Sequence, residues 1–155
     1  MGIKNQGAWN AGLDRFAKSI DTKGVLFQKK MAFLVLGGAV LLASGQILPG
    51  SGLLQLTPVD TAFAVGNWQV TLGAPATGTV AAGSQSSRGE ANRGPAVAAV
   101  TGRASRALAA LKLGQSIFIA NNAPYILVLN DGGVNRVAHH MVERAIANAR
   151  ASVRA

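Results

Sequence analysis

The feature that most constrains the fold is an apolar run, Met31–Ser44 (MAFLVLGGAVLLAS), which follows Lys29 and Lys30. A bilayer span needs about 20 apolar residues, so this run of about 14 is too short to cross a membrane. It also begins too far into the chain for a secretory signal peptide. A helix that is apolar on every face is normally buried on all sides. We therefore expect a core helix over about residues 25–47, ended at Pro49, and its complete burial in so small a chain indicates an oligomer.

The size and charge of the chain set further bounds. Its 155 residues give room for one domain with a single core. It has no cysteine, which excludes disulfide scaffolds, cysteine-based zinc sites and thiol nucleophiles. The net charge of +9 is concentrated in residues 1–30 and 101–155, while the stretch between them is balanced. Cationic ends suit contact with nucleic acid or an acidic protein, but they also fit ordinary solvated helix faces.

Three further segments have the periodicity of helices. An amphipathic pattern over residues 9–20 ends near Gly24, so residues 1–24 are expected to form a separate N-terminal helix. Residues 103–113 have small and apolar side chains at helical spacing. The last segment, Val134 to Val153, has the clearest apolar stripe in the chain, with basic side chains opposite.

Strands are expected in three places. Residues 67–72 alternate between apolar and polar side chains, which is typical of a half-buried strand. Residues 116–120 and 125–129 are rich in β-forming side chains, and residues 121–124 between them suit a hairpin connection. The sequence therefore predicts an α+β domain in the order α-α-β-arm-α-β-β-α. Its small antiparallel sheet would be packed by a long apolar helix and a C-terminal amphipathic helix.

The arm in this order is a long stretch rich in Gly, Ala, Ser, Thr and Pro, over about residues 74–102. It has few larger apolar side chains, so we expect a flexible loop that orders on a neighbouring subunit or ring. The residues singled out as candidate assembly contacts are Gly73, Pro75, Arg88 and Arg93.

No group of residues predicts catalysis. His139 and His140 are adjacent, so on a helix they point about 100° apart, and with Glu143 they do not complete a metal site. Asp60 is better explained as a turn or helix cap than as a general base. Phosphate-binding loops and nucleophile elbows are also missing from the sequence. We expect a protein that is not an enzyme and that uses no cofactor and no metal.

The order of four short segments resembles a known family. The segments are Thr57–Thr61 (TPVDT), Asn67–Gly73 (NWQVTLG), Ile117–Leu129 (IFIANNAPYILVL) and His140–Ala145 (HMVERA). They are similar to the neck or tail-completion proteins of tailed phages, the group related to minor tail protein Z, over about residues 25–150. The matching motif residues are Pro58, Asp60, Thr61, Trp68, Asn121, Pro124, Tyr125, Gly132 and Met141.

The chain also departs from the family pattern. Ala62 and His140 stand where the family usually has glycine, and Asn130-Asp131-Gly132 replaces a Glu-x-Gly turn.

The resemblance implies a structural virion protein that joins head and tail. Such a subunit would form a ring, expected to be a hexamer, at the neck of the particle, after assembly in the host cytoplasm. Its partners would be a stopper, adaptor or portal ring on the head side and a tail terminator or tail tube protein on the other. DNA would pass through the lumen without sequence-specific reading, and no membrane would be involved.

Two alternatives come from the residues alone. The basic ends are compatible with a nucleic-acid-binding module, although base-stacking aromatic side chains beside them are missing. The apolar run over residues 31–48 is compatible with a small membrane-associated protein, which binding to liposomes would reveal.

Overall fold

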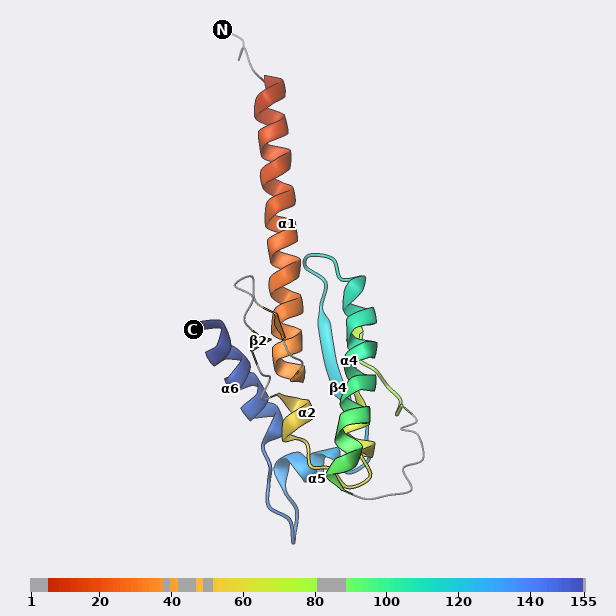
Figure 1. Cartoon of the computed structure of the whole chain (residues 1–155). Coiled ribbons are helices and arrows are strands. Elements are labelled where there is room, and N and C mark those ends of the chain that lie inside the picture. The colour runs from red at the N-terminus through yellow and green to blue at the C-terminus, as the bar shows by residue number, and fades with distance from the viewer. Residues whose placement is uncertain (1–5, 38–39, 42–46, 49–51, 81–88, 155) are drawn as a thin grey trace.

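The computed structural model describes residues 6–37, 40–41, 47–48, 52–80 and 89–154. As expected, the fold is α+β. One long helix, α1 (Gln6–Leu36), runs alongside the body at its C-terminal end and projects well beyond it at its N-terminal end (Figure 1). No helix in these residues is long and apolar enough to cross a bilayer.

A single helix, α1, stands where the sequence predicted two helices, and it ends before the predicted end of the second. α1 continues without a break through Gly24, because a single interior glycine costs a helix only about 1 kcal/mol. It ends at Leu36, short of the expected end near Ile47. Gly37 adopts a φ of +96°, and its N–H donates to the Phe33 carbonyl at 2.9 Å, which closes the last turn. The expected separate helix over residues 1–24 and core helix over 25–47 are therefore wrong in their boundaries.

Two short strands follow α1. Strands β1 (Val40–Leu41) and β2 (Ile47–Leu48) form a small antiparallel pair. Two single-turn helices come next, α2 (Leu53–Leu56) and α3 (Phe63–Gly66).

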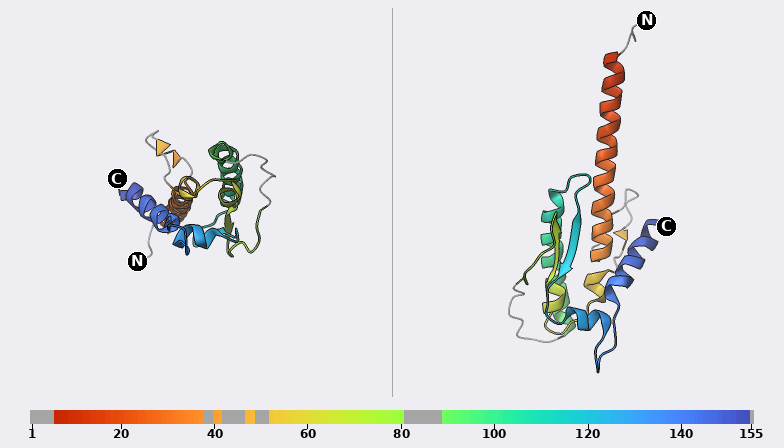
Figure 2. Two further views of the ribbon diagram at one scale, coloured as in Figure 1. Left: turned by 90° about the horizontal axis from the view of Figure 1, so that it is seen from below. Right: turned by 180° about the vertical axis from the view of Figure 1, so that it is seen from behind.

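The main sheet has two antiparallel strands. β3 (Trp68–Leu72) pairs with β4 (Ile117–Asn121), with Trp68 opposite Asn121 and Leu72 opposite Ile117. Both strands were expected from the sequence. Figure 2 shows α4 (Arg93–Ala109) beside this sheet, after a short 3₁₀ helix, η1 (Glu90–Asn92).

The second half of the expected arm is a helix that belongs to the core. Residues 93–102 lie in α4, whose buried face is formed by Ala96, Val100, Ala104 and Leu108. The spacing of four places these side chains on one face, and their small size lets the helix approach the sheet closely. The expectation that this stretch builds no core was wrong, because it counted large side chains only.

The first part of that stretch is a loop attached to the sheet. Gly73 N–H donates to the Ser116 carbonyl at 3.0 Å, and the Asn122 side chain donates to the Ala76 carbonyl at 2.9 Å. Val80 N–H donates to the Asn67 side chain at 2.7 Å. Residues 81–88, which include Arg88, lie outside the described residues.

The expected third strand is a helix. Residues 126–131 form α5 (Ile126–Asp131), so β4 pairs with β3 and residues 121–124 are not a hairpin. A short run that is apolar on both faces suits either a buried strand or a buried helix, and here tertiary packing selects the helix.

The C-terminal helix is also shorter than its apolar stripe. α6 (Met141–Arg154) packs its buried side chains Met141, Ala145 and Ala149 against the body and lies beside α1 and α2. The stripe residues Val134 and Val137 instead lie on a hairpin before α6, closed by a bridge between Gly133 and Arg136.

Candidate functional site

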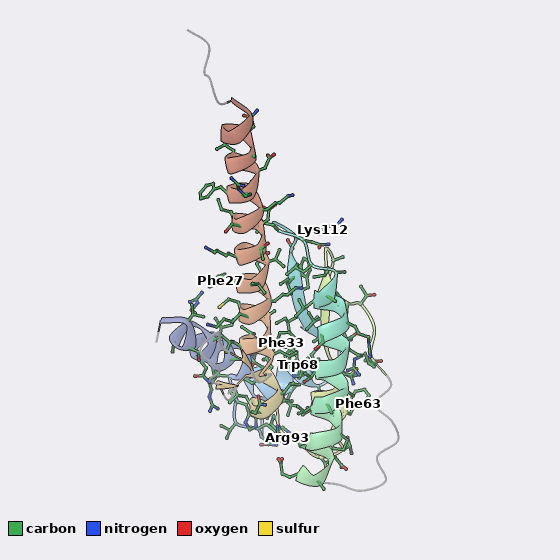
Figure 3. All side chains as sticks on the ribbon, turned by 45° about the horizontal axis from the view of Figure 1, so that its top comes forward. Phe27, Phe33, Phe63, Trp68, Arg93 and Lys112 are labelled. Carbon is green, nitrogen blue, oxygen red and sulfur yellow. The ribbon has the colours of Figure 1, made fainter. Side chains whose placement is uncertain are left out.

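A buried group of contacts joins three of the segments that carry the family resemblance, Thr57–Thr61, Asn67–Gly73 and His140–Ala145. The Trp68 indole N–H donates to the Thr57 hydroxyl at 2.9 Å, and that hydroxyl donates to the Leu53 carbonyl at 2.6 Å. The sulfur of Met141, which is fully buried, lies 3.3 Å from the same hydroxyl. Thr57 therefore links the turn, the strand and the last helix. Figure 3 shows Trp68, the first residue of β3, within the body.

Asn121 has a similar bracing role at the end of β4. Its side-chain N–H donates to the Ala64 carbonyl at 2.7 Å, and its side-chain oxygen accepts the N–H of Ala123 at 3.0 Å. These two bonds turn the chain after the strand. Pro124 and Tyr125 follow directly and lead into α5.

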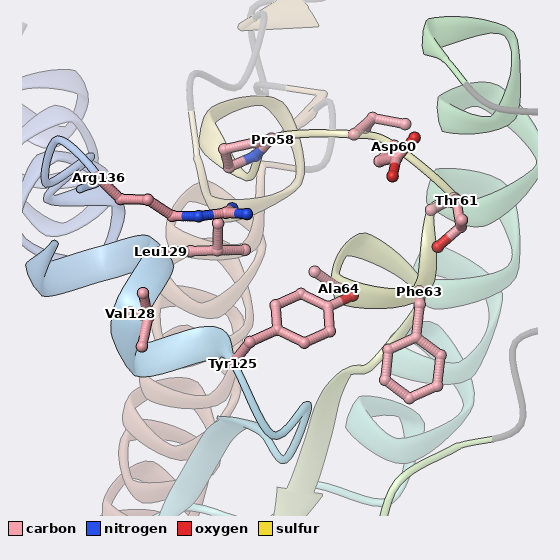
Figure 4. A pocket seen from close by; sticks show the side chains of 11 residues that line it. Pro58, Asp60, Thr61, Phe63, Ala64, Tyr125, Val128, Leu129 and Arg136 are labelled. Atoms are coloured by element: carbon pink, nitrogen blue, oxygen red, sulfur yellow. The ribbon is translucent and has the colours of Figure 1, made fainter. Parts of the chain in front are cut away.

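The turn before α3, the start of α5 and the hairpin before α6 enclose a cleft of about 590 Å³ (Figure 4). Four of the motif residues line this cleft. Pro58, Asp60 and Thr61 come from the segment Thr57–Thr61, and Tyr125 comes from the segment Ile117–Leu129. The other lining residues are Val59, Ala62, Phe63, Ala64, Val128, Leu129 and Arg136.

Tyr125 forms the floor of this cleft with Phe63. The two ring centroids lie 6.2 Å apart with their planes tilted by 38°, which suits an aromatic contact. Burial raises the pKa of the Tyr125 hydroxyl above its ordinary value, and the charge of Asp60 raises it further. A hydrogen bond from the Ala64 backbone acts in the opposite direction on the same pKa. The phenol therefore stays neutral at ordinary pH.

The opposite wall carries Arg136, which was not expected from the sequence. Figure 4 shows its side chain extending toward Pro58 and Leu129. The hairpin that carries it is attached to α5, since His139 N–H donates to the Leu129 carbonyl at 3.1 Å.

Gly132 makes the turn into this hairpin possible. Its φ is +85°, and an added Cβ would lie 3.0 Å from both the Arg136 carbonyl oxygen and the Ala138 nitrogen. The hairpin is thus a fixed support, and Arg136 reaches the cleft from a defined backbone position.

Ala62, which lines the cleft, and His140, directly before α6, have an uncommon backbone conformation. Within the described part of the chain, Ala62 (φ +62°) and His140 (φ +45°) are the non-glycine residues with positive φ. Non-glycine residues adopt this conformation in only a few per cent of cases, because Cβ crowds the backbone. Both positions are those at which the family usually has glycine.

The other sequence candidates have structural roles. Arg93 begins α4 and donates to the carbonyls of Leu54, Gln55 and Thr57 within the same chain, so it does not lie on a flexible arm. Its role as an assembly contact stays a prediction. Gly73 and Pro75 belong to the loop that is attached to the sheet. The N-cap residue of α3 is Ala62, whose side chain makes no capping hydrogen bond, and the role of Asp60 as a turn or cap residue stays a prediction.

The histidine segment shows no metal cluster within the described residues. Asn130, which sequence reasoning treated only as part of a turn, accepts the N–H of Val142 at 3.0 Å and so caps the first turn of α6. Its side-chain N–H also lies 3.3 Å from the Glu143 carboxylate. Asn130 is twelve residues from Val142 along the chain, so no local capping signal in the sequence could have identified this contact.

No family model, curated protein or solved structure matches this chain.

Proposed function

We propose that this protein is a structural virion subunit of a tailed phage, which forms a ring at the head–tail neck and joins the connector to the tail. The work of such a subunit is binding to copies of itself and to the adjoining layers, with DNA passing through the lumen.

The coincidence at Ala62 and His140 carries this proposal. The resemblance places glycine at these two positions, and both have the left-handed backbone that glycine adopts at the lowest cost. The resemblance rests on residue types alone, so agreement with the backbone at two chosen positions is an independent argument for it. A second supporting observation is that Thr57 contacts both Trp68 and Met141, so residues from three of the similar segments meet in one core.

The distribution of exposed apolar side chains suits a joining role. At one end, the projecting half of α1 exposes Leu13, Phe16 and Ile20, with Phe16 65% exposed. At the other end, the hairpin exposes Val134 almost completely and Val137 by 84%. Figure 1 shows these two elements at opposite ends of the molecule. Apolar surface of this kind commonly marks contact with other proteins, and here it is available in two directions.

The test is a phage that carries this gene with a stop codon introduced into it. We expect lysates grown without suppression to contain filled heads and free tails that are not joined, as seen by negative-stain electron microscopy. Adding the purified protein should restore joined particles. Intact infectious particles without the protein would reject the proposal.

A pair of variants locates the assembly surface on α1. Phe16→Glu with Ile20→Glu should prevent rings of the purified protein and leave helix content unchanged, since both side chains are exposed. Lys18→Glu, a change on the opposite face of the same helix, is the matched control and should still form rings. If the double variant forms normal rings, the projecting half of α1 is not the ring contact.

A further inference from the structure

We propose that the cleft between the turn before α3 and the hairpin before α6 binds an extended apolar peptide segment. This segment carries a carboxylate and belongs to a partner protein of the adjoining layer. This inference rests on the proposed function, because it names the chemistry of a partner of the joining subunit.

The size and lining of the cleft fit a peptide. About 590 Å³ lies within the range of sites that enclose small ligands or a few side chains. Pro58, Phe63, Tyr125 and Leu129 provide rigid apolar surface, which costs little conformational entropy on binding. Val134 and Val137, on the same hairpin as Arg136, are also exposed.

The charged groups at the cleft define the polarity of its occupant. Arg136 reaches in from the hairpin, and Asp60 lies on the wall formed by the α3 turn (Figure 4). A guanidinium beside apolar surface binds a carboxylate through charge-assisted, geometrically defined hydrogen bonds. A segment would therefore bind with its carboxylate toward Arg136.

The charge of the whole chain favours a different protein over a second copy. With a net charge of +9 and six acidic residues in all, this chain has few acidic segments to offer. An acidic partner would also be attracted electrostatically.

The backbone around the cleft is arranged before any partner binds. Gly132 and the bond from His139 to Leu129 fix the hairpin, and Asn121 fixes the turn that leads to Tyr125. Because the site is already formed, the conformational entropy lost on binding is mainly that of the peptide.

The test is selection of a displayed library of short random peptides on three forms of the full-length protein. The wild type should enrich apolar peptides with one Asp or Glu. Arg136→Glu should weaken the binding of these peptides by about ten- to a hundredfold, and should select Lys or Arg in place of the acid. Arg150→Glu, the same charge reversal on the exposed face of α6, is the matched control and should select the wild-type set.

Two results would overturn the inference. One is that the wild type enriches no common sequence. The other is that Arg136→Glu selects the same peptides as the wild type and the control Arg150→Glu. A Tyr125→Ala variant adds a check on the apolar floor, with loss of enrichment expected. Failure of the phage complementation assay would reject the proposed function but leave a charge-dependent peptide selection standing, so the two ideas fail separately.

Discussion

Arg93 offers the sharpest test of the structural argument, because sequence reasoning and the structure assign it opposite roles. As an arm residue it would contribute nothing to the stability of the free subunit. In the structure its guanidinium lies 2.6 Å from the Leu54 carbonyl and 3.1 Å from those of Gln55 and Thr57. It also forms an ion pair with Glu90 at 2.7 Å. The side chain is only 24% exposed.

The expected cost of removing this contact follows from the geometry. The C-terminal carbonyls of α2 have no helical partner of their own, so loss of the guanidinium leaves partly buried acceptors unpaired. Hydrogen bonds that involve a charged group are worth about 1.5–3 kcal/mol each, and one nitrogen shared among three carbonyls cannot satisfy all of them fully. We therefore expect Arg93→Met, which keeps most of the stem, to cost about 2–3 kcal/mol. The ion pair with Glu90 adds little, because that carboxylate is exposed to solvent.

The measurement is equilibrium urea unfolding of the purified protein. With a slope of about 2 kcal/mol per molar urea for a chain of this size, the unfolding midpoint should fall by about 1 M. Arg106→Met, on an exposed position of the same helix, is the matched control and should leave the midpoint unchanged. Glu90→Gln should also change it little. An Arg93→Met protein with the wild-type midpoint would refute the clamp.

Three further predictions concern the core and the cleft. Tyr125 is the single tyrosine, so the ultraviolet absorbance of tyrosinate follows it alone; its pKa should lie above 10.0 in the folded protein and return to its ordinary value in urea. Since the folded state then holds the proton more tightly than the unfolded state, this contribution to stability should be complete below pH 10.0 and fall as the pH rises above it. Tyr125 is 42% exposed, so the shift should be modest, and a folded-state pKa at or below the ordinary value would contradict the partial burial of this phenol. Thr57→Val removes the buried acceptor of the Trp68 indole and should cost about 1–3 kcal/mol in urea unfolding. Thr57→Ser keeps the hydroxyl and should cost only the buried methyl group, about 0.8 kcal/mol. His140→Gly should stabilise the protein by about 0.5–1 kcal/mol by relieving a left-handed backbone, whereas His139→Gly should destabilise it; equal effects in calorimetry would argue against the conformation at residue 140.

Local patterns in the sequence determined the α+β class, strands β3 and β4, and the amphipathic character of the last helix. These features depend on the alternation or helical spacing of apolar side chains over a few residues. That spacing is a property of the sequence itself and does not depend on which segments pack against it. The prediction that Met141 and Ala145 lie on the buried face of the last helix was also correct. The motif residues Pro58, Asp60, Thr61 and Tyr125 were identified as a set, although their meeting in one cleft was not.

Only the tertiary structure decided the remaining features. Residues 126–131 form a helix while β4 pairs with β3, and residues 93–102 form a core helix whose small side chains pack on that sheet. Arg93 and Arg136 have the same chemistry in the sequence, yet one clamps α2 while the other lines a cleft. Such roles depend on groups that are distant along the chain, and the free energy of burying a side chain is set by the partners that folding brings to it.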